Sequence, residues 1–274
     1  MTDRAADSEK HIRRLMKTAG QVLDPAMRKH FLVAKFRVME DEEIAEAIYR
    51  MQSIALAGDS EARVVVASGL DAGLILRKLG KVRVGRIYHE AKRRGYLNVC
   101  NLFRSLRPLK SPEGDEEAFL KYGLPDLTVG ERKAAARSRD PNMLARVGYD
   151  PDPLVIRQLL KNPRVIEKMV VTITARRPNR PEVLEIVYRS AKWRARPEVR
   201  RALVRNPYTA PHLAMALVPM LNRQELEDVA YDGNIHPEVR EAAENALEAK
   251  KQALQETEKE NEPPAAKPSP ETWH

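Results

Sequence analysis

The sequence predicts an all-α protein in which a helical N-terminal domain is followed by a short series of stacked helical repeats. Three observations favour this class. Aromatic residues make up only 5% of the chain and charged residues 32%, a balance that suits helices with a large exposed surface better than a β-sandwich. The 19 prolines interrupt any long helix, so many short helices are expected. A basic phrase of twelve residues at 152–163 recurs at 196–207.

The N-terminal domain is expected to occupy residues 1–106. Its clearest helix spans residues 39–58, with Asp41 as the expected N-cap and Gly58 at its C-terminal end. The apolar stripe of this helix recurs at spacings of three and four, as in Ile44, Ala47, Ile48, Met51, Ile54 and Ala55. The other helices of this domain are expected at 1–20, 24–36, 60–69, 71–80, 82–96 and 98–106. A polar linker containing proline and glycine is expected at 107–124.

Residues 125–247 are periodic. The phrases DPLVIRQLLKNP (152–163) and RPEVRRALVRNP (196–207) share their prolines, a basic position and a closing Asn-Pro, and HPEVREAAENAL (236–247) is a third copy without that Asn-Pro. A second element of the repeat aligns on three leucines: Leu144, Leu184 and Leu226. The steps between equivalent positions are 40, 42 and 44 residues.

The chemistry of the phrase predicts how each repeat folds. A proline in the first turn of a helix loses no hydrogen bond, because the N–H at that position has no helical partner. Asn206 precedes Pro207, which disfavours helix at Asn206 and ends the first helix. Asn206 is also expected to cap the next helix, with Pro207 as its first residue. Each helix carries only one apolar stripe, so neighbouring repeats must stack to complete a core.

A period of roughly 40–47 residues built from two or three helices is the length class of HEAT and armadillo repeats. With its PxVRxxLxxNP-like phrases, the segment 125–247 resembles the HEAT, armadillo and leucine-rich-repeat-variant group of α-solenoids. The resemblance implies an α-solenoid architecture. Two features of that group are not carried over: a cysteine-bound iron–sulfur cluster, because Cys100 is the single cysteine, and peptide-binding asparagines, because Asn162 and Asn206 stand at helix boundaries.

Charge is distributed unevenly along the chain, whose net charge is +9 with a pI near 9.6. Residues 77–110 hold 11 Lys or Arg against one acid, and residues 151–211 hold 14 against 5. Residues 216–274 hold 6 against 13, and their last part, 248–274, is expected to be a disordered acidic, proline-rich tail. A basic surface of this kind fits nucleic acid or an acidic protein.

The first hypothesis for function is a non-enzymatic binding scaffold. Stacking would bring equivalent basic positions of successive repeats onto one wall, where they would hold an acidic segment of a protein partner. The residues expected to bind the partner are Arg157, Lys161, Arg176, Arg177, Lys192, Trp193, Arg194, Arg196, Arg200, Arg201 and Arg205. The alternative is that these side chains cover apolar surface and pair with neighbouring acids, namely Glu167, Glu182, Glu185 and Glu198.

The second hypothesis is nucleic-acid binding through residues 77–110, the repeats, or both. This stretch loosely follows helix-turn-helix spacing, with a glycine at the turn and a basic second helix. The basic residues that would face nucleic acid are Arg83, Arg86, Lys92, Arg93 and Arg94.

The sequence contains no recognisable catalytic motif. No HExxH, Walker loop, GxGxxG or GxSxG is present, so no cofactor, metal or enzymatic activity is expected, and an enzyme with a concealed site is the third hypothesis. The start of the chain lacks the apolar core of a signal peptide, and no run approaches the roughly 18 apolar residues that would span a bilayer. A cytoplasmic protein without membrane insertion is expected.

Overall fold

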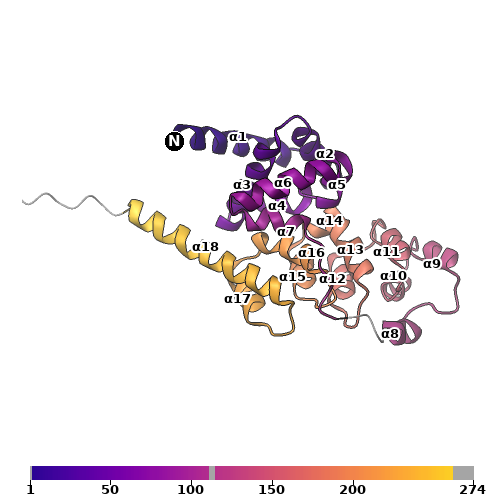
Figure 1. The fold of residues 1–274 in the computed structure, drawn as a ribbon. Coiled ribbons are helices and arrows are strands. Elements are labelled where there is room, and N and C mark those ends of the chain that lie inside the picture. Colours follow the sequence, from indigo (N-terminus) through magenta and orange to yellow (C-terminus); the bar gives the residue numbers. More distant parts are fainter. Residues whose placement is uncertain (1, 111–114, 262–274) are drawn as a thin grey trace, which may run out of the picture.

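The computed structural model describes residues 2–110 and 115–261, and across these ranges it contains helices and turns without any strand. The all-α class is therefore confirmed (Figure 1). The N-terminal half consists of α1 (Thr2–Gly20), α2 (Pro25–Phe36), α3 (Asp41–Ala57), α4 (Ser60–Gly69), α5 (Ala72–Leu79), α6 (Lys81–Arg93) and α7 (Leu97–Phe103). Helix α3 is its centre and packs against α1, α4, α6 and α7.

Helix ends in this half follow their capping residues. The side chains of Asp24, Asp59 and Asp71 accept hydrogen bonds from backbone N–H groups at the starts of α2, α4 and α5. Gly58 ends α3 with φ of 115°, a left-handed conformation that glycine adopts without steric cost. The predicted N-cap of α3 is corrected, since Glu40 holds that position. Asp41 is the first helical residue, and its carboxylate pairs with arginines of α6 instead.

The C-terminal half begins with α8 (Asp115–Tyr122) and continues as three units of three main helices each. The first unit has α9 (Val129–Ala135), α10 (Pro141–Val147) and α11 (Pro153–Leu159). The second has α12 (Glu167–Ala175), α13 (Pro181–Arg189) and α15 (Pro197–Val204), with the short α14 (Ala191–Arg194) between the last two. The third has α16 (Pro211–Leu217) with the 3-10 turn η1 (Val218–Met220), α17 (Arg223–Tyr231) and α18 (Pro237–Asn261).

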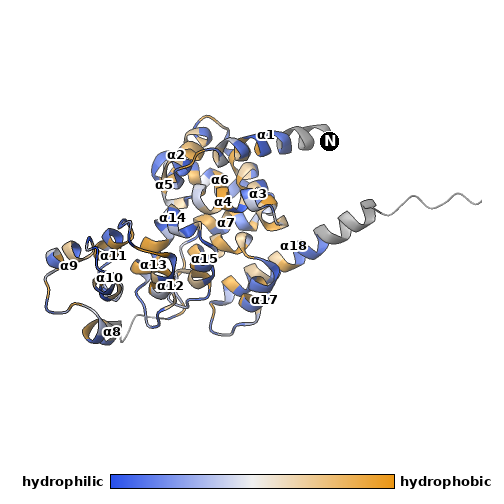
Figure 2. Cartoon of the chain, turned by 180° about the vertical axis from the view of Figure 1, so that it is seen from behind, coloured by the Kyte–Doolittle hydropathy of each residue, from blue (hydrophilic) through white to orange (hydrophobic). Residues whose placement is uncertain are grey.

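Neighbouring units contact one another through the third helix of one unit, which packs against a helix of the next. Helix α11 packs against α13 of the next unit, and α15 packs against α16 of the unit after that. This arrangement is compatible with a helical repeat. Figure 2 shows apolar residues gathered in inner helices such as α13 and hydrophilic residues along outer helices such as α1.

A buried asparagine ties the first helix to the third in two of the units. The Asn162 amide donates to the carbonyls of Ala136 and Ser138 at 3.0 and 2.8 Å, just beyond the end of α9. The Asn206 amide donates to the carbonyls of Thr174 and Arg176 at 2.6 and 3.0 Å, at the end of α12. These bonds satisfy carbonyls that a helix end leaves without partners.

The predicted capping role of the Asn-Pro pair is wrong. Helix α16 begins at Pro211, so Asn206 and Pro207 lie in the preceding turn, where the Asn206 side-chain oxygen accepts from the Tyr208 N–H at 3.0 Å. The third copy of the phrase has Ala246 and Leu247 at the equivalent positions, and there α18 continues as helix to Asn261. The Asn-Pro pair therefore ends a helix where it is present, as predicted, but does not begin the next.

The two halves share one core. A continuous cluster of buried apolar residues extends from Ile12 in α1 to Ala246 in α18, and α4 contacts α14 while α7 contacts α16. Arg104 donates to both carboxylate oxygens of Glu238 at 2.7 and 3.0 Å, which joins α18 to the segment after α7. These contacts fix the halves against each other, whereas their predicted division into separate domains remains a prediction.

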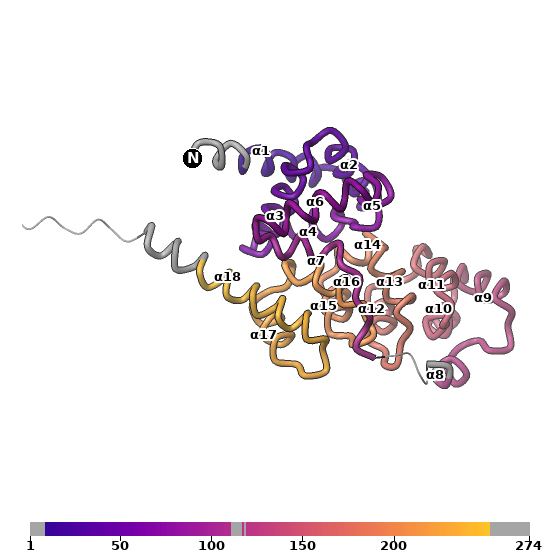
Figure 3. Tube along the Cα trace, in the orientation of Figure 1, coloured from indigo at the N-terminus to yellow at the C-terminus, as the bar shows by residue number. Residues whose placement is uncertain are grey.

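The C-terminal segment leaves the packed body as a helix. Helix α18 extends to Asn261, so the predicted tail at 248–274 begins as helix, and residues 262–274 lie outside the described residues. Figure 3 shows α18 and α9 at opposite ends of the molecule. Across the described ranges, none of the helices combines the length and the apolar character required to span a bilayer.

Candidate anion-binding cleft

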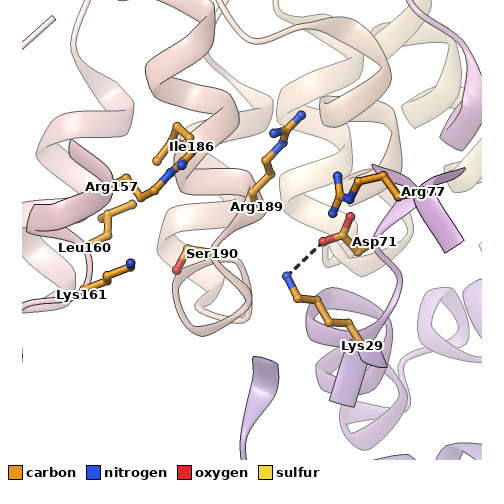
Figure 4. Close-up of a pocket in the computed structure, with 9 residues that line it drawn as sticks. All are labelled: Lys29, Asp71, Arg77, Arg157, Leu160, Lys161, Ile186, Arg189 and Ser190. Carbon is orange, nitrogen blue, oxygen red and sulfur yellow. Dashed lines mark hydrogen bonds and ion pairs between the residues drawn. The ribbon is translucent and has the colours of Figure 1, made fainter. Parts of the chain in front are cut away.

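A cleft of about 290 Å³ lies between the N-terminal half and the first two repeat units. The N-terminal half contributes Lys29 of α2, Asp71 at the N-cap of α5, and Arg77 of α5. The repeat units contribute six residues of α11, α13 and the turns that follow them: Arg157, Leu160, Lys161, Ile186, Arg189 and Ser190. Figure 4 shows the side chains of the two halves on opposite sides of the opening, with Ser190 between them.

The cleft is lined by five basic side chains and one carboxylate. Lys29 pairs with Asp71 at 3.3 Å, and Arg189 pairs with Glu185 one turn earlier at 2.6 Å. Within residues 2–110 and 115–261, no carboxylate lies within ion-pair distance of Arg77, Arg157 or Lys161, and all three side chains are exposed. The cleft therefore carries uncompensated positive charge, which attracts anions.

Asp71 is an internal part of the site. Its carboxylate is buried, accepts a hydrogen bond from the Leu74 N–H at 2.8 Å and pairs with Lys29. Burial alone would raise the pKa of this carboxyl group, but the charges of Arg194 and Lys29 and the Leu74 hydrogen bond outweigh it and hold the pKa below its usual value. Asp71 is consequently ionised at neutral pH and keeps Lys29 at the edge of the cleft.

Arg194 joins the two halves close to Asp71. It is 1% exposed, its Nε donates to the Ala67 carbonyl of α4, and its guanidinium lies 4.7 Å from the centre of the Tyr188 ring. These contacts join α4 to α13 and α14.

Two of the predicted partner-binding residues, Arg157 and Lys161, line the cleft. Their repeat equivalents, Arg201 and Arg205, have different surroundings. Arg201 pairs with Glu198 in its own helix and lies 3.7 Å from the Glu225 carboxylate of α17. Arg205 lies 3.7 Å from the carboxylate of Asp228, also in α17. Of the two repeated pairs of cations, Arg157 and Lys161 therefore have no carboxylate partner among the described residues, whereas Arg201 and Arg205 are neutralised.

Three predicted surface residues are buried, and their expected exposure is corrected. Trp193 is 2% exposed, and its indole N–H donates to the Leu160 carbonyl at 3.0 Å. Arg194 is the buried arginine described above. Arg200 is 6% exposed, donates to the Ala195 carbonyl at 2.6 Å and has its pKa lowered by burial. These side chains hold the repeat units together and are inaccessible to a partner.

The remaining predicted residues of the repeats are dispersed. Arg176 lies 5.7 Å from the centre of the Tyr149 ring, and Lys192 lies 4.2 Å from that of Trp193. Arg196 is 3.9 Å from the Glu167 carboxylate, and Arg177 donates to the Arg205 carbonyl. None of these four lines the cleft.

The basic helix α6 is largely neutralised by α3 and by its own glutamate. Arg83 and Arg86 pair with Asp41 at 2.7 and 2.5 Å. Arg93 pairs with Glu90 at 2.7 Å, and Arg94 with three glutamates: Glu42, Glu46 and Glu90. Lys92 is exposed and has no ion pair within the described ranges. Most of the charge proposed for nucleic-acid contact is therefore engaged within the protein.

Sequence reasoning did not select Lys29, Arg77 or Arg189 as site residues. Arg77 begins the basic stretch 77–110, which was a usable signal, but nothing local distinguishes Lys29, whose partner Asp71 is 42 positions away. The described residues contain no cluster of three or more His, Cys, Asp or Glu side chains arranged to hold a metal ion. Comparison with protein families, with characterised proteins and with solved structures finds no match to this chain.

Proposed function

We propose that the protein is a non-enzymatic binding scaffold whose cleft takes an acidic segment of a protein partner. One observation carries the proposal: Arg157 and Lys161 converge on a concave site without acidic partners among the described residues, while Arg201 and Arg205 at the equivalent positions are paired. Cations gathered without counter-charges repel one another, and an acidic ligand relieves that repulsion.

The arrangement of the repeats supports a role in binding. Stacked helical units expose the ends and outer faces of successive helices as one continuous surface, to which an extended segment can bind. The proposal includes the finer assignment of these units as a HEAT/armadillo-like solenoid, which rests on their period and on the three-helix pattern. The apolar walls of the cleft, Leu160 and Ile186, would contact the aliphatic parts of the ligand.

Nucleic acid is the second candidate ligand, and the geometry supports it less. A strand of nucleic acid needs a track of unpaired cations spaced along its phosphates. Helix α6 offers few such cations, because Arg83, Arg86, Arg93 and Arg94 are engaged by acids. Three of the cations without a carboxylate partner among the described residues, Arg77, Arg157 and Lys161, line a single cleft.

Binding to an acidic peptide library tests the proposal. The probe is a fluorescein-labelled library of 11-residue peptides with Asp or Glu at half of the positions, and the control library has Asn or Gln there. We expect the acidic library to bind the full chain at about 0.15 M salt and the control library to bind at least tenfold more weakly.

A matched pair of double variants locates the site. Arg157→Gln/Lys161→Gln removes two charges from the cleft, and Arg201→Gln/Arg205→Gln removes the same number from the equivalent positions. We expect the first variant to weaken binding of the acidic library by tenfold or more and the second by less than threefold, about 0.65 kcal/mol. Equal losses in the two variants, or no loss in either, would refute the proposed site.

A further inference from the structure

We propose that the group held in the cleft is a phosphoryl group, carried on a phosphorylated serine or threonine of the acidic segment. This inference rests on the proposed function and specifies its ligand. It follows from the directions from which the cations approach, from their number, and from the single concavity they enclose.

The cations approach from separate elements. Arg77 comes from α5, Arg157 and Lys161 from α11 and the turn after it, and Arg189 from the end of α13. A carboxylate presents two oxygens in one plane, whereas a phosphoryl group presents three acceptor oxygens around a tetrahedral centre. Donors on opposite sides of an opening (Figure 4) match the tetrahedral group better. Arginine forks in particular bind two phosphoryl oxygens at once.

The charge of the cleft also favours a dianion. Arg77, Arg157 and Lys161 have no carboxylate partner within the described ranges, and the one carboxylate of the lining, Asp71, is already paired with Lys29. Asp71 repels any anion that enters. Both this repulsion and the attraction to the five cations grow in proportion to the charge of the ligand, so a phosphoryl group with about 1.5 to 2 negative charges at pH 7 gains more from the net positive cleft than a carboxylate with one.

Ser190 adds a neutral donor to the same site. Its hydroxyl lies at the end of α13, lines the cleft and has no hydrogen-bond partner within residues 2–110 and 115–261. A hydroxyl can donate to a phosphoryl oxygen that the arginines leave free. Recognition of a phosphorylated motif by clustered arginines is an established mode of peptide binding, and the cleft supplies its chemistry.

A protein segment fits the site better than nucleic acid. The cleft has a volume of about 290 Å³, which accommodates one phosphoryl group and the side chain that carries it. Helix α6 offers few cations for a second phosphate, because Arg83, Arg86 and Arg93 are paired with acids. A phosphorylated side chain brings one phosphoryl group into the cleft, whereas a nucleic-acid strand carries successive phosphates that would need further contacts outside it.

Three 11-residue peptide libraries test the inference, each degenerate at every position except the centre. The central residue is phosphoserine in the first, glutamate in the second and serine in the third. Fluorescence polarisation with the full chain at about 0.15 M salt should give an affinity at least tenfold higher for the phosphoserine library than for the glutamate library. Arg157→Gln/Lys161→Gln should remove this preference, and Arg201→Gln/Arg205→Gln should retain it.

The outcomes separate the inference from the proposed function. Equal affinity for the phosphoserine and glutamate libraries, with both weakened by Arg157→Gln/Lys161→Gln, overturns the phosphoryl group and leaves acidic-segment binding intact. If neither these libraries nor the acidic library binds, both proposals are overturned.

Inorganic phosphate that binds as tightly as the phosphoserine library, or a 12-nucleotide single-stranded RNA that binds more tightly, overturns the phosphorylated protein segment as the source. A Ser190→Ala variant that weakens the phosphoserine library about threefold and leaves the glutamate library unchanged supports the inference.

Discussion

The junction between α11 and α13 and the junction between α15 and α17 have the same pair of basic residues in different surroundings. At the first, Arg157 and Lys161 face a cleft lined by Ile186 of α13. At the second, Arg201 and Arg205 lie beside Glu225 and Asp228 of α17. Aligning the two helices on Leu184 and Leu226 places Ile186 at the position of Asp228 and Val183 at that of Glu225.

The difference shows that repetition of a cation is insufficient to make a binding surface. The repeated phrase places a basic residue at the same point of each unit, but nearby carboxylates, from its own helix and from the second helix of the following unit, decide whether that residue is neutralised. The acidic C-terminal quarter of the chain supplies the neutralising carboxylates at the second junction. The first junction meets a helix with apolar residues at those positions and also the basic edge of α5.

The largest expected effect concerns the feature that both units share, the buried asparagine. Asn206→Ala removes the donor to the Thr174 and Arg176 carbonyls and leaves the buried Thr174 carbonyl without its partner. We expect a loss of about 3 kcal/mol in the free energy of unfolding, measured by urea denaturation. Asn162→Ala should cost a similar amount, because it makes the same two bonds in the preceding unit. A cost below about 1 kcal/mol in both would show that water replaces the amide.

The next effect is expected when the side chain that distinguishes the two junctions is exchanged, Ile186 in α13 against Asp228 in α17. Ile186→Asp places in α13 the carboxylate that α17 has at Asp228, beside Arg157 in the cleft lining (Figure 4). We expect binding of the acidic peptide library to fall by tenfold or more, about 1.4 kcal/mol. Ile186→Ala is the matched control, because it removes a comparable apolar surface without adding charge. If both variants lose the same affinity, packing rather than charge governs the cleft.

A smaller effect concerns the stability of the protein at low pH. Of the two junctions, it involves only the one between α11 and α13, where Asp71 lines the cleft. The pKa of Asp71 is lower in the folded protein than in the unfolded chain, so its contribution to stability is present above the unfolded value, about 3.9. That contribution is lost as the pH falls through the lower, folded value. Asp71→Asn should therefore flatten the acid dependence of the free energy of unfolding below about pH 4, measured by urea titrations. An unchanged slope would mean that Asp71 does not titrate differently on folding.

The smallest expected effect compares stability rather than binding at the two junctions. Arg201→Gln/Arg205→Gln removes ion pairs whose arginines are 39% and 44% exposed, and we expect a loss below about 1 kcal/mol that disappears at high salt. Arg157→Gln/Lys161→Gln should change stability by less than about 0.5 kcal/mol, because no ion pair is lost. Thermal unfolding of both variants at low and high salt measures the difference. A larger loss from the cleft variant would reveal a structural role for Arg157 or Lys161.

Local features of the fold were predictable from the sequence. The helix at 60–69 has the predicted bounds, and proline opens α11, α15 and α18 as the repeat phrase indicated. Caps, proline positions and apolar stripes act within one or two helical turns, so they can be recognised in a single stretch of sequence. The Asn-Pro pair was misread because the carbonyls to which Asn206 donates lie 30 and 32 positions earlier in the chain.

The site was predictable only in part. Arg157 and Lys161 were selected by their recurrence, but Trp193, Arg194 and Arg200 were selected with them and are buried. The sequence places all five in one basic stretch. It does not indicate that Arg194 reaches the Ala67 carbonyl of the N-terminal half, 127 positions away.

By itself, the sequence determined that this protein is helical, that its C-terminal half repeats, and where its basic residues stand along each repeat. Only the tertiary structure decided which of those residues are buried, which are neutralised and which face a cleft. The reason is that helix formation depends on neighbours along the chain, whereas a charge interacts with whatever lies within a few ångströms of it in space. Lys29 and Arg77 line the same cleft as Arg157 and Lys161 because α2 and α4 pack against α14.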